Sequence, residues 1–387
     1  MKILQVHNFY RQAGGEDQVY AAEYELLTRH GHTVTQYTAR NDAINGMSGI
    51  GAAARTIWNS HTYREVAALL QRESPAIVHA HNTFPLLSPS LYYAAAKAHV
   101  PVVQTLHNYR LLCPAATLFR NGHVCEECVG SALAYKAVVH RCYRNSAAAS
   151  ATTATMLLFH RIAGSWNTKV NTYVALTDFA RDKFIEGGLP AGKIAVKPNF
   201  LSADPGVGGG NGNYALFASR LSEEKGVRAL LDAWARPGST IPLKIAGDGP
   251  MEGYVRERVA RLENVEWLGY CPRERLLDLM RDARLLVFPS LWYEGLPLTF
   301  IEAMACGTPV VAAGLGSMNE LIQDGVNGFR FTAGDAGSLV ERLRWISSRP
   351  DKLREMRRSS RLYYEQNYTP ERNYQMLLEI YRRSLPN

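Results

Sequence analysis

Apolar strand segments alternate with amphipathic helical segments along almost the whole of this 387-residue chain. Because strands that are joined through a helix usually pair in the same direction, the alternation predicts parallel sheets with helices on both faces. A strongly charged helical run is expected from about Leu339 to Arg383. The expected strands are 2–8, 33–39, 76–81, 102–107, 172–177 and 194–198, followed by 214–219, 243–247, 265–269, 285–290 and 309–313.

The stretch 199–213, NFLSADPGVGGGNGN, interrupts this alternation. Its content of Gly, Asn, Asp and Pro is typical of a linker. The chain is therefore expected to be an α/β protein with two doubly wound Rossmann-like domains, at 1–198 and 214–365, that face each other across a cleft. Ligands bind such sheets outside the carboxyl ends of the strands, so candidate site residues are expected there.

The charge of the chain favours an acidic partner. The net charge is +8, and residues 1–195 carry 18 Lys and Arg against 12 Asp and Glu. Nucleotide phosphates and anionic lipid head groups fit this balance better than nucleic acid, because the sequence has neither zinc-finger spacing nor the aromatic strand signature of RNA binding. No apolar run reaches about 18 residues, and MKILQVHNFY lacks the features of a signal peptide, so a cytoplasmic protein is expected.

The segment 294–312, EGLPLTFIEAMACGTPVVA, is typical of a turn followed by a helix and a strand. Pro297 suits the first helical position, and Gly307 suits the stop after the helix. The free N–H groups of Leu298 and Thr299 would then point out of the helix start. Backbone donors and the positive end of the helix dipole together bind anions at such a place.

Two glutamates of the same segment flank this predicted anion site. Glu302 lies one turn into the helix, where its carboxylate can accept both hydroxyls of a ribose diol. Glu294 lies in the turn before the helix and can hydrogen-bond a second polyol. One anion between two hydroxyl-rich groups describes a nucleotide sugar. A surface helix with two solvated glutamates is the other interpretation.

A basic loop follows the first predicted strand of the second domain. In ASRLSEEKGV, Arg220 and Lys225 are placed where two cations can balance the charge of a diphosphate. A solvated loop, with Glu223 and Glu224 as partners of the cations, is the alternative.

Glycines follow two other predicted strands. GDGP at 247–250 is a glycine turn, and Gly14–Gly15 opens a helix after the first strand of the chain. Glycine lets backbone approach a phosphate or a sugar closely. Each of these two signals is weak when taken alone.

Cysteines gather in the segment 109–144, which we interpret as an insertion of the first domain. The C-x2-C core has metal-ligand spacing, and two outer cysteines could complete a structural zinc site with four thiolate ligands. A set of buried or redox-inert thiols is the alternative. The predicted ligands are Cys113, Cys125, Cys128 and Cys142.

The segment that follows the cysteines, Ser146–Trp166, mixes small residues with MLLFHRIAGSW. Basic residues surround it, so it could lie on an anionic membrane surface and hold the first domain at the inner face of a membrane as a peripheral protein. A packed core helix is the alternative. The surrounding basic residues are Arg141, Arg144, Arg161 and Lys169.

Taken together, these motifs resemble glycosyltransferase family 4, the retaining nucleotide-sugar transferases with the GT-B fold. The two glutamates of EGLPLTFIEAMACGTPVVA carry the specific part of the resemblance. SRLSEEKG, GDGP, the Gly-Gly stretch and TLHN occur in the order of the family. The resemblance covers nearly the whole chain and implies a terminal helix, 366–387, that crosses back to the first domain.

The resemblance implies roles for single residues. Arg220 and Lys225 would hold the donor diphosphate, and Glu294 and His107 would lie near the transferred sugar, so that these four form the catalytic set. Further donor-binding residues are implied at Gly14, Gly15, Gly269, Tyr270, Cys271, Gly295, Leu298, Thr299 and Glu302.

The resemblance also implies a reaction. A hexosyl or N-acetylhexosaminyl group would pass from a UDP- or GDP-sugar, with retention of configuration, to a glycan or lipid-linked glycan acceptor in the synthesis of a cell-surface polysaccharide or glycolipid. No cofactor is expected for catalysis, because Arg220 and Lys225 can balance the charge of the leaving group. A nucleotide-sugar 2-epimerase on the same fold and a catalytically inactive binding module are the alternatives.

Overall fold

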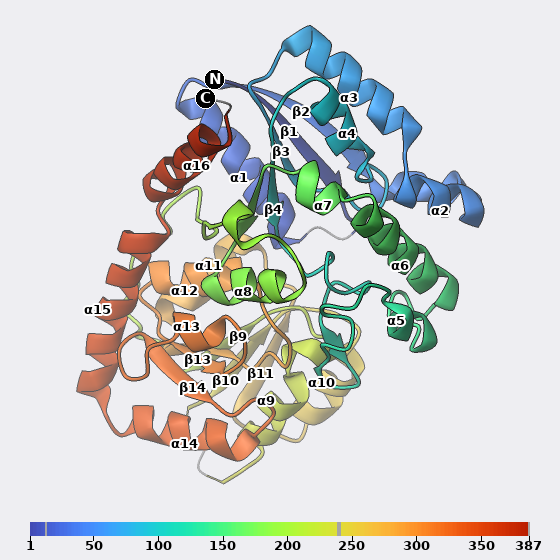
Figure 1. The fold of residues 1–387 in the computed structure, drawn as a ribbon. Helices are drawn as coiled ribbons and strands as arrows, with labels where there is room; N and C mark the ends of the chain where they lie inside the picture. Colours follow the sequence, from blue (N-terminus) through green and yellow to red (C-terminus); the bar gives the residue numbers. More distant parts are fainter. Residues whose placement is uncertain (12–13, 238–240, 386–387) are drawn as a thin grey trace. The chain divides into compact units, whose positions relative to one another are not determined.

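The computed structural model describes residues 1–11, 14–237 and 241–385. Two residues of the stretch around Gly14 and the last two residues of the expected terminal helix lie outside this description. The chain forms two compact units, which Figure 1 colours along the sequence. Unit 1 consists of Met1–Leu118, Glu126–Ser202 and Pro370–Asn387, and unit 2 consists of Phe119–Cys125 and Ala203–Thr369.

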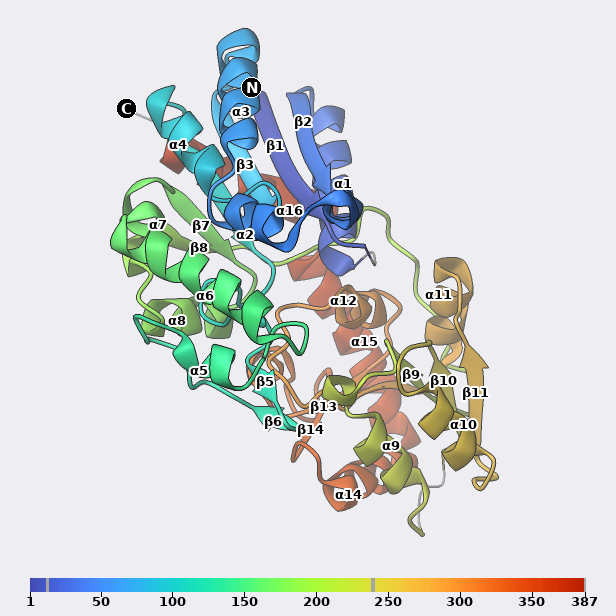
Figure 2. The ribbon, with the colours of Figure 1, turned by 90° about the vertical axis from the view of Figure 1, so that its right-hand side faces the viewer.

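Unit 1 is built on a six-stranded parallel sheet (Figure 2). In spatial order its strands are β2 (Thr33–Arg40), β1 (Lys2–Phe9), β3 (Ile77–Asn82), β4 (Val102–Leu106), β7 (Thr172–Ala175) and β8 (Ile194–Val196). Its helices are α1 (Gly15–Arg29), α2 (Gly49–Ile57), α3 (Ser60–Glu73), α4 (Ser90–Lys97), α5 (Tyr135–Val139), α6 (Ala147–Ile162), α7 (Ser165–Thr168), α8 (Asp178–Glu186) and α16 (Pro370–Ser384).

Unit 2 has a second six-stranded parallel sheet. In spatial order its strands are β11 (Val265–Gly269), β10 (Leu243–Ala246), β9 (Ala215–Ala218), β12 (Leu285–Phe288), β13 (Val310–Ala313) and β14 (Gly328–Phe331). Its helices are α9 (Val227–Trp234), α10 (Glu252–Val259), α11 (Arg273–Asp282), α12 (Leu298–Ala305), α13 (Met318–Leu321), α14 (Ala336–Ser347) and α15 (Pro350–Asn367). A small antiparallel hairpin of β5 (Phe119–Arg120) and β6 (His123–Val124) also belongs to this unit.

The prediction of two doubly wound α/β units is confirmed, and every predicted strand is present. The sequence analysis missed β14, a four-residue strand with only two large apolar side chains, Phe329 and Phe331. It also missed the hairpin of β5 and β6. The charged run expected from Leu339 to Arg383 is divided into α14, α15 and α16. Pro350 and Pro370 each begin a new helix, because proline has no N–H to continue the preceding one.

The order of strands reverses direction at one place in each sheet. In unit 1 the first strand β1 lies between β2 and β3, and in unit 2 the first strand β9 lies between β10 and β12. Crossovers leave such a strand toward opposite sides of the sheet and open a crevice at its carboxyl end. The candidate site residues of each unit are therefore expected after β1 and β9 and after their neighbours.

The glycine-rich stretch predicted as a linker packs closely within unit 2. The N–H of Gly208 donates to the carbonyl of Cys306 at 3.0 Å, and the N–H of Gly210 donates to the carbonyl of Arg281 at 3.1 Å. A Cβ atom added to Gly208 would lie 2.1 Å from the carbonyl oxygen of Arg281. Only glycine therefore fits at Gly208 without a shift of the backbone.

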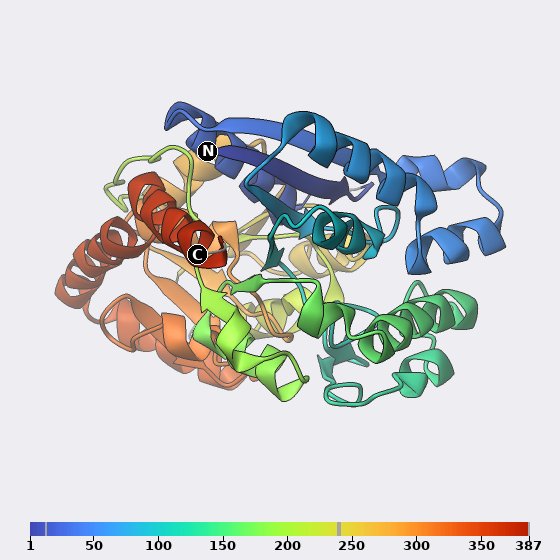
Figure 3. The ribbon, with the colours of Figure 1, turned by 45° about the horizontal axis from the view of Figure 1, so that its top comes forward.

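The last helix, α16, completes the core of unit 1 (Figure 3). It packs against α1 and β4. Leu377 and Tyr381 are fully buried, and Ile380 is nearly so. These three side chains join an apolar cluster contributed by the sheet and by α1, which consists of Ile3, Leu27, Ile77, Val103 and Val174.

Leu377→Ala is expected to lower the free energy of unfolding of unit 1 by about 2–5 kcal/mol, because it leaves a cavity in this cluster. Denaturant unfolding, with hydrogen exchange of the β1 and β3 amides to locate the change, measures the loss. Leu362→Ala is the matched control, since Leu362 is 54% exposed on α15 and belongs to unit 2. An equal loss in both variants would contradict the structural role assigned to α16.

Candidate functional site

Glu294 lies in the turn between β12 and α12, at the carboxyl edge of the unit 2 sheet. Its side chain is buried and accepts hydrogen bonds from Lys225 Nζ and Ser290 Oγ, both at 2.7 Å to Oε1. Ser317 Oγ donates to its backbone carbonyl at 2.9 Å. Glu294 and Lys225, which lie 69 residues apart in sequence, thus form a single charge-paired element at the strand ends.

A glycine brings Lys225 to this position. Gly226 has φ +73°, and a Cβ atom there would lie 1.8 Å from the carbonyl oxygen of Pro289, directly after β12. The N–H of Leu291 donates to the carbonyl of Glu224 at 2.8 Å and ties the two loops together. The close approach of these loops is therefore what joins Lys225 to Glu294.

The GDGP turn supports the loop of Arg220. Cβ atoms added to Gly247 and Gly249 would lie 2.0 Å from the carbonyl oxygen of Ser219 and 2.7 Å from that of Leu221. The N–H of Leu221 donates to the carbonyl of Asp248 at 2.6 Å. Arg220 itself is exposed at the carboxyl end of β9. The two glycines of GDGP thus have a structural role, because they let the loop of Arg220 pack directly against the backbone of the GDGP turn.

The start of α12 lies beside this charge pair. The helix begins at Leu298, and Pro297 is its N-cap rather than its first residue as predicted. In the part of unit 2 that the structure describes, no side chain caps this helix start. The N–H groups of Leu298 and Thr299 therefore remain available to an anion. Gly307 ends the helix with φ +68°, as the sequence indicated.

Glu302 is buried in α12 and pairs with a residue that the sequence analysis missed. Arg273 Nη2, at the start of α11, lies 2.9 Å from Glu302 Oε1. Burial raises the pKa of Glu302, and the charge of Arg273 partly opposes that rise. No sequence signal pointed to this pair, because the two positions lie 29 apart in the sequence, on different helices with β12 between them.

The remaining donor-side residues surround the same edge of the unit 2 sheet. Gly269 ends β11 with φ +68°, and Tyr270 after it is 72% exposed. Cys271 is partly buried, and its Sγ lies 3.8 Å from the carbonyl of Gly269. Gly295 is also partly exposed. Unit 2 thus gathers cations, free backbone donors and carboxylates at one edge, a combination that can bind a phosphate beside hydroxyl groups.

In unit 1 the turn between β1 and α1 carries the predicted Gly14–Gly15. Gly14 is the N-cap of α1, and a Cβ atom there would meet no atom within 4 Å. Asp17 closes the turn: its Oδ2 accepts from the N–H of Gly14 at 3.0 Å, and its Oδ1 lies 2.7 Å from His7 Nε2 on β1. Close packing with the described residues therefore does not require a glycine at position 14.

Glu16 is a site residue that the sequence analysis missed. Its two carboxyl oxygens accept from Asn82 Nδ2 and Asn108 Nδ2, each at 3.3 Å, so it connects the ends of β3 and β4. Burial, and secondarily the charge of Asp17, raises the pKa of Glu16 to about 8. A carboxyl group that holds its proton near neutral pH is typical of functional sites. The only sequence signal was its place directly after Gly14–Gly15.

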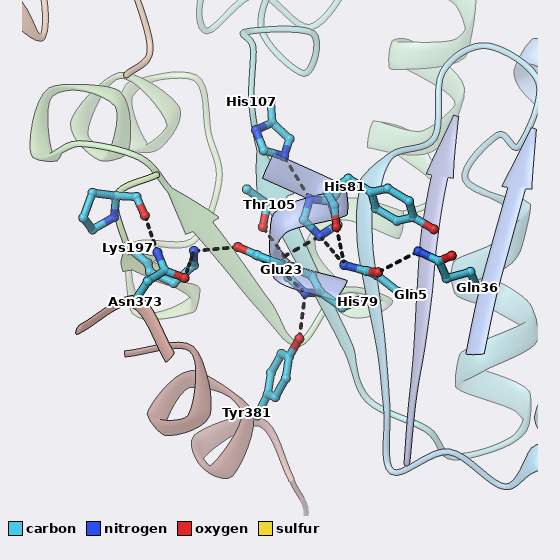
Figure 4. Close-up of polar contacts among 12 residues, drawn as sticks. Gln5, Glu23, Gln36, His79, His81, Thr105, His107, Lys197, Asn373 and Tyr381 are labelled. Carbon is cyan, nitrogen blue, oxygen red and sulfur yellow. Dashed lines mark hydrogen bonds and ion pairs between the residues drawn. The ribbon is translucent and has the colours of Figure 1, made fainter. Parts of the chain in front are cut away.

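His107 follows β4 and is in contact with a second histidine. Its Nε2 lies 3.0 Å from Nδ1 of His81 on β3, and the two rings stack. Burial is the main cause that holds the pKa of His107 well below its ordinary value. His81 continues into a fully buried polar cluster around Glu23 and Lys197 (Figure 4).

The four cysteines of the predicted zinc site are divided between the two units. Cys113, Cys128 and Cys142 belong to unit 1, whereas Cys125 belongs to unit 2. Cys128 and Cys142 pack in one small apolar cluster beside α5 and α6. Among the described residues, the groups of ligating atoms that converge closely enough for a metal include no cysteine. A zinc site with four thiolate ligands stays a prediction.

The segment predicted to lie either on a membrane or in the core contains α6 and the first two residues of α7. One face of α6 packs inward, with Ala154, Met156 and Leu157 buried, while Phe159 and Ile162 are exposed. Within the described ranges, no helix is both long and apolar enough to cross a bilayer. The core interpretation thus holds for one face of α6, and contact of its other face with a membrane stays a prediction.

Two protein-family models match this chain. Residues 14–199 match the model described as a glycosyl transferase 4-like domain, and residues 207–363 match the model described as glycosyl transferases group 1. Together the two models cover most of the chain and meet at the stretch predicted as a linker.

Individual proteins are similar to parts or to all of the chain. The phosphatidyl-myo-inositol mannosyltransferase of Mycobacterium leprae is 32% identical over 52% of this chain and 56% of that protein. The O-antigen chain mannosyltransferase B of Escherichia coli is 38% identical over 29% of this chain and 31% of that protein. The match thus spans about half the length of the first relative and less than a third of the second.

Solved structures share the fold over nearly the full length. HepE of Anabaena in complex with UDP superimposes with a TM-score of 0.68 at 20% identity, over 98% of this chain and 99% of that one. A glycosyltransferase of Rickettsia africae superimposes with a TM-score of 0.72 at 16% identity, over 100% and 99% of the two chains. Because the sequence identities are 20% and 16%, the structural similarity establishes a shared fold and nothing further.

Gly226→Ala is expected to lower the free energy of unfolding of unit 2 by more than about 1 kcal/mol, because the new methyl group collides with the carbonyl of Pro289 and forces the Lys225 loop away. Denaturant unfolding measures the change. Gly253→Ala is the control, since a Cβ atom at this position in α10 meets nothing within 4 Å. Equal stabilities of the two variants would contradict the packing described here.

Unit 1 is expected to lose stability as the pH falls from about 7 to 5. Burial lowers the folded-state pKa of five histidines of this unit below the ordinary 6.5, so the unfolded chain binds protons first as the pH falls. Proton binding then lowers the free energy of the unfolded chain relative to that of the folded one. Glu16 acts in the opposite direction, because its raised pKa makes the folded state bind a proton, but it is outnumbered. The five are His7, His32, His79, His107 and His160.

Hydrogen exchange at several pH values, corrected for the intrinsic exchange rates, tests this prediction within one molecule. Protection of the β1 and β3 amides should fall with pH, whereas protection of the β12 and β13 amides of unit 2 should change less. Unit 2 contains a single histidine, His123. An equal loss of protection in both sheets would show that buried histidines are not the cause.

Proposed function

The chain belongs to the glycosyltransferases that the group 1 and 4-like models describe, and from this premise we propose that it transfers a sugar from a nucleotide diphosphate to a hydroxyl acceptor. The observation that carries the proposal is the edge of unit 2, where Arg220, Lys225 and the start of α12 lie beside Glu294 and Glu302. Solved structures of the same fold contain UDP or UDP-glucose, which agrees with a uridine nucleotide as the donor.

In this proposal the two cations and the helix start bind the diphosphate. The N–H groups of Leu298 and Thr299 would donate to phosphate oxygens, and Arg220 and Lys225 would balance the charge that grows on the diphosphate as its bond to the sugar breaks. Lys225 is held in place before the donor arrives by its contact with Glu294. Such preorganised groups stabilise the transition state without reorientation during the reaction.

The two carboxylates would bind hydroxyl groups. Glu302 is buried on α12 and would accept the ribose diol once the exposed Arg273 side chain moves toward solvent or phosphate. Glu294 would contact the hydroxyls of the transferred sugar. Neither carboxylate needs to act as a nucleophile, so the acceptor attacks on the face from which the diphosphate leaves, and a phosphate oxygen takes its proton. The configuration of the sugar is then retained.

Unit 1 would supply the acceptor side. His107, Glu16, Asn82 and Asn108 present hydrogen-bonding groups at the carboxyl ends of β3 and β4, next to Gly14. We propose a glycan or a lipid-linked glycan as the acceptor, in the synthesis of a surface polysaccharide or glycolipid. The relatives named for a phosphatidyl-inositol acceptor and for an O-antigen chain agree with this class. The exposed apolar residues of α6 and the basic residues around them would contact an anionic membrane surface.

Arg220→Ala is expected to lower kcat/KM for sugar transfer by about 100- to 1000-fold, because one charge that stabilises the leaving diphosphate is lost. The assay follows release of the nucleoside diphosphate with the donor and a glycan acceptor. Arg261→Ala is the matched control, since Arg261 is exposed and lies just before β11, at the opposite edge of the sheet. A transfer rate of Arg220→Ala equal to that of Arg261→Ala would rule out the role of Arg220.

The same assay separates transfer from the two alternatives. An epimerase would convert the donor without an acceptor, and a binding module would hold the nucleotide without turnover. Proton NMR of the anomeric position of the product reports whether the configuration is retained.

A further inference from the structure

A buried ion pair lies in unit 1 below the carboxyl ends of β3 and β4 (Figure 4). Lys197 Nζ, directly after β8, is 2.7 Å from Glu23 Oε1 on α1, and both side chains are fully buried. Asn373 Oδ1, on α16, lies 3.3 Å from the same ammonium group. The charge of Lys197 holds the pKa of Glu23 well below its usual value despite the burial, so Glu23 is a carboxylate.

The second oxygen of Glu23 faces two histidines. His81 Nε2 lies 3.3 Å from Oε2, and His79 Nδ1 lies 3.6 Å from it. His79 has other partners for both of its nitrogens, because Tyr381 Oη is 2.8 Å from Nδ1 and Thr105 Oγ1 is 2.9 Å from Nε2. No hydrogen bond from the described residues reaches this buried oxygen, so the nearer ring nitrogen, Nε2 of His81, interacts with it through charge. A lone pair on Nε2 would be repelled by the ionised oxygen, whereas a proton on Nε2 is attracted to it.

The opposite arrangement would place the lone pair of His81 Nε2 against the carboxylate. Gln5 Nε2 also lies 3.4 Å from this nitrogen, and its other hydrogen donates to the carbonyl of Tyr20 at 3.2 Å. The attraction between an N–H group and an ionised oxygen is strong in a fully buried place, whereas the contact with Gln5 is a long one between neutral groups, so Glu23 rather than Gln5 decides the tautomer of His81.

A metal ion does not fit this cluster. Atoms of Glu23, His79 and His81 lie close enough together to ligate one. Lys197, however, already neutralises the carboxylate, and a divalent cation would add uncompensated positive charge in a fully buried place. An imidazolium at His81 would likewise leave the buried group with a net positive charge.

A neutral His81 with its proton on Nε2 has Nδ1 as an acceptor. His107 Nε2 lies 3.0 Å from that atom and must therefore carry a proton in order to donate to it. Because burial keeps His107 neutral, its remaining nitrogen, Nδ1, is then unprotonated. His107 is partly exposed at the end of β4 and lines a small cavity together with Asn108 and Arg110.

We propose that Glu23, held by Lys197, fixes through His81 the tautomer of His107, so that His107 offers Nδ1 as a hydrogen-bond acceptor to a hydroxyl group of the donor sugar or the acceptor. Glu23, Lys197 and His81 are positioning residues in this scheme, and His107 is the group that contacts substrate. The consequence for the reaction rests on the proposed function, whereas the tautomer is a property of the protein alone.

Long-range proton–nitrogen NMR of the substrate-free protein, labelled with 15N-histidine, tests the tautomer directly. The His107 signals are identified by their loss in a His107→Gln variant. We expect a protonated Nε2 and an unprotonated Nδ1 at neutral pH. A His107 whose proton lies on Nδ1, or which is doubly protonated, would overturn the proposal, whether or not any variant folds and whether or not the protein transfers sugar.

The double variant Glu23→Gln/Lys197→Met tests the role of the ion pair without leaving a lone buried charge. The amide group that replaces the carboxylate can donate to His81 Nε2, which would reverse both tautomers, so the Nε2-protonated fraction of His107 should fall from nearly all to a minority. Tyr381→Phe is the matched control: it removes a hydroxyl from the same buried cluster but contacts His79 rather than His81. It should destabilise unit 1 while leaving the His107 tautomer unchanged.

Sugar transfer provides the second measurement. The kcat/KM of the double variant is expected to fall at least about tenfold, which is the usual effect of removing a residue that orients a site residue. The kcat/KM of Tyr381→Phe is expected to stay within about twofold of that of the natural protein. A double variant with an unchanged His107 tautomer, or one with a reversed tautomer and full activity, would contradict the proposal. Activity lost to the same degree in Tyr381→Phe would assign the cluster a purely structural role.

Discussion

The two parallel sheets impose the constraint on which the candidate site depends. Because each crossover returns the chain to the same edge before the next strand, the loops that follow the strands collect at the carboxyl ends. In unit 2 this places Arg220, Lys225, Glu294 and the start of α12 together, although they come from separate parts of the sequence. The same rule gathers Gly14, Glu16, Asn82 and His107 in unit 1.

Close packing of glycine loops turns this general placement into specific contacts. Gly226, Gly247 and Gly249 each lie where a Cβ atom would overlap a neighbouring backbone carbonyl. Their role in unit 2 is to let the basic loop approach its neighbours, so that Lys225 reaches Glu294. The cations of the candidate site are thus oriented by backbone packing, and they need little reorganisation when an anion binds.

The two units stabilise their buried charged side chains in different ways. In unit 2 the ion pairs Lys225–Glu294 and Arg273–Glu302 join a buried carboxylate to a cation that keeps some exposure to solvent. In unit 1 the pair Lys197–Glu23 is wholly buried and is closed by α16, which supplies Asn373 and Tyr381. Removal of either partner would leave a lone charge in the interior, so the pair is costly to break and keeps one fixed geometry. That rigidity is what allows it to influence His81 and His107.

The sequence by itself determined the α/β alternation, the two sheets and the motifs after their strands, because these follow from local periodicity and from glycine and proline positions. It identified Glu294, Glu302, Arg220 and Lys225 as candidates for the same reason. The tertiary structure alone decided that Arg273 pairs with Glu302, that Glu16 connects two strand ends, and that Glu23 meets Lys197 at a separation of 174 residues. No local pattern encodes such pairs, since a buried charge selects its partner by distance in the folded chain and not by distance along the sequence.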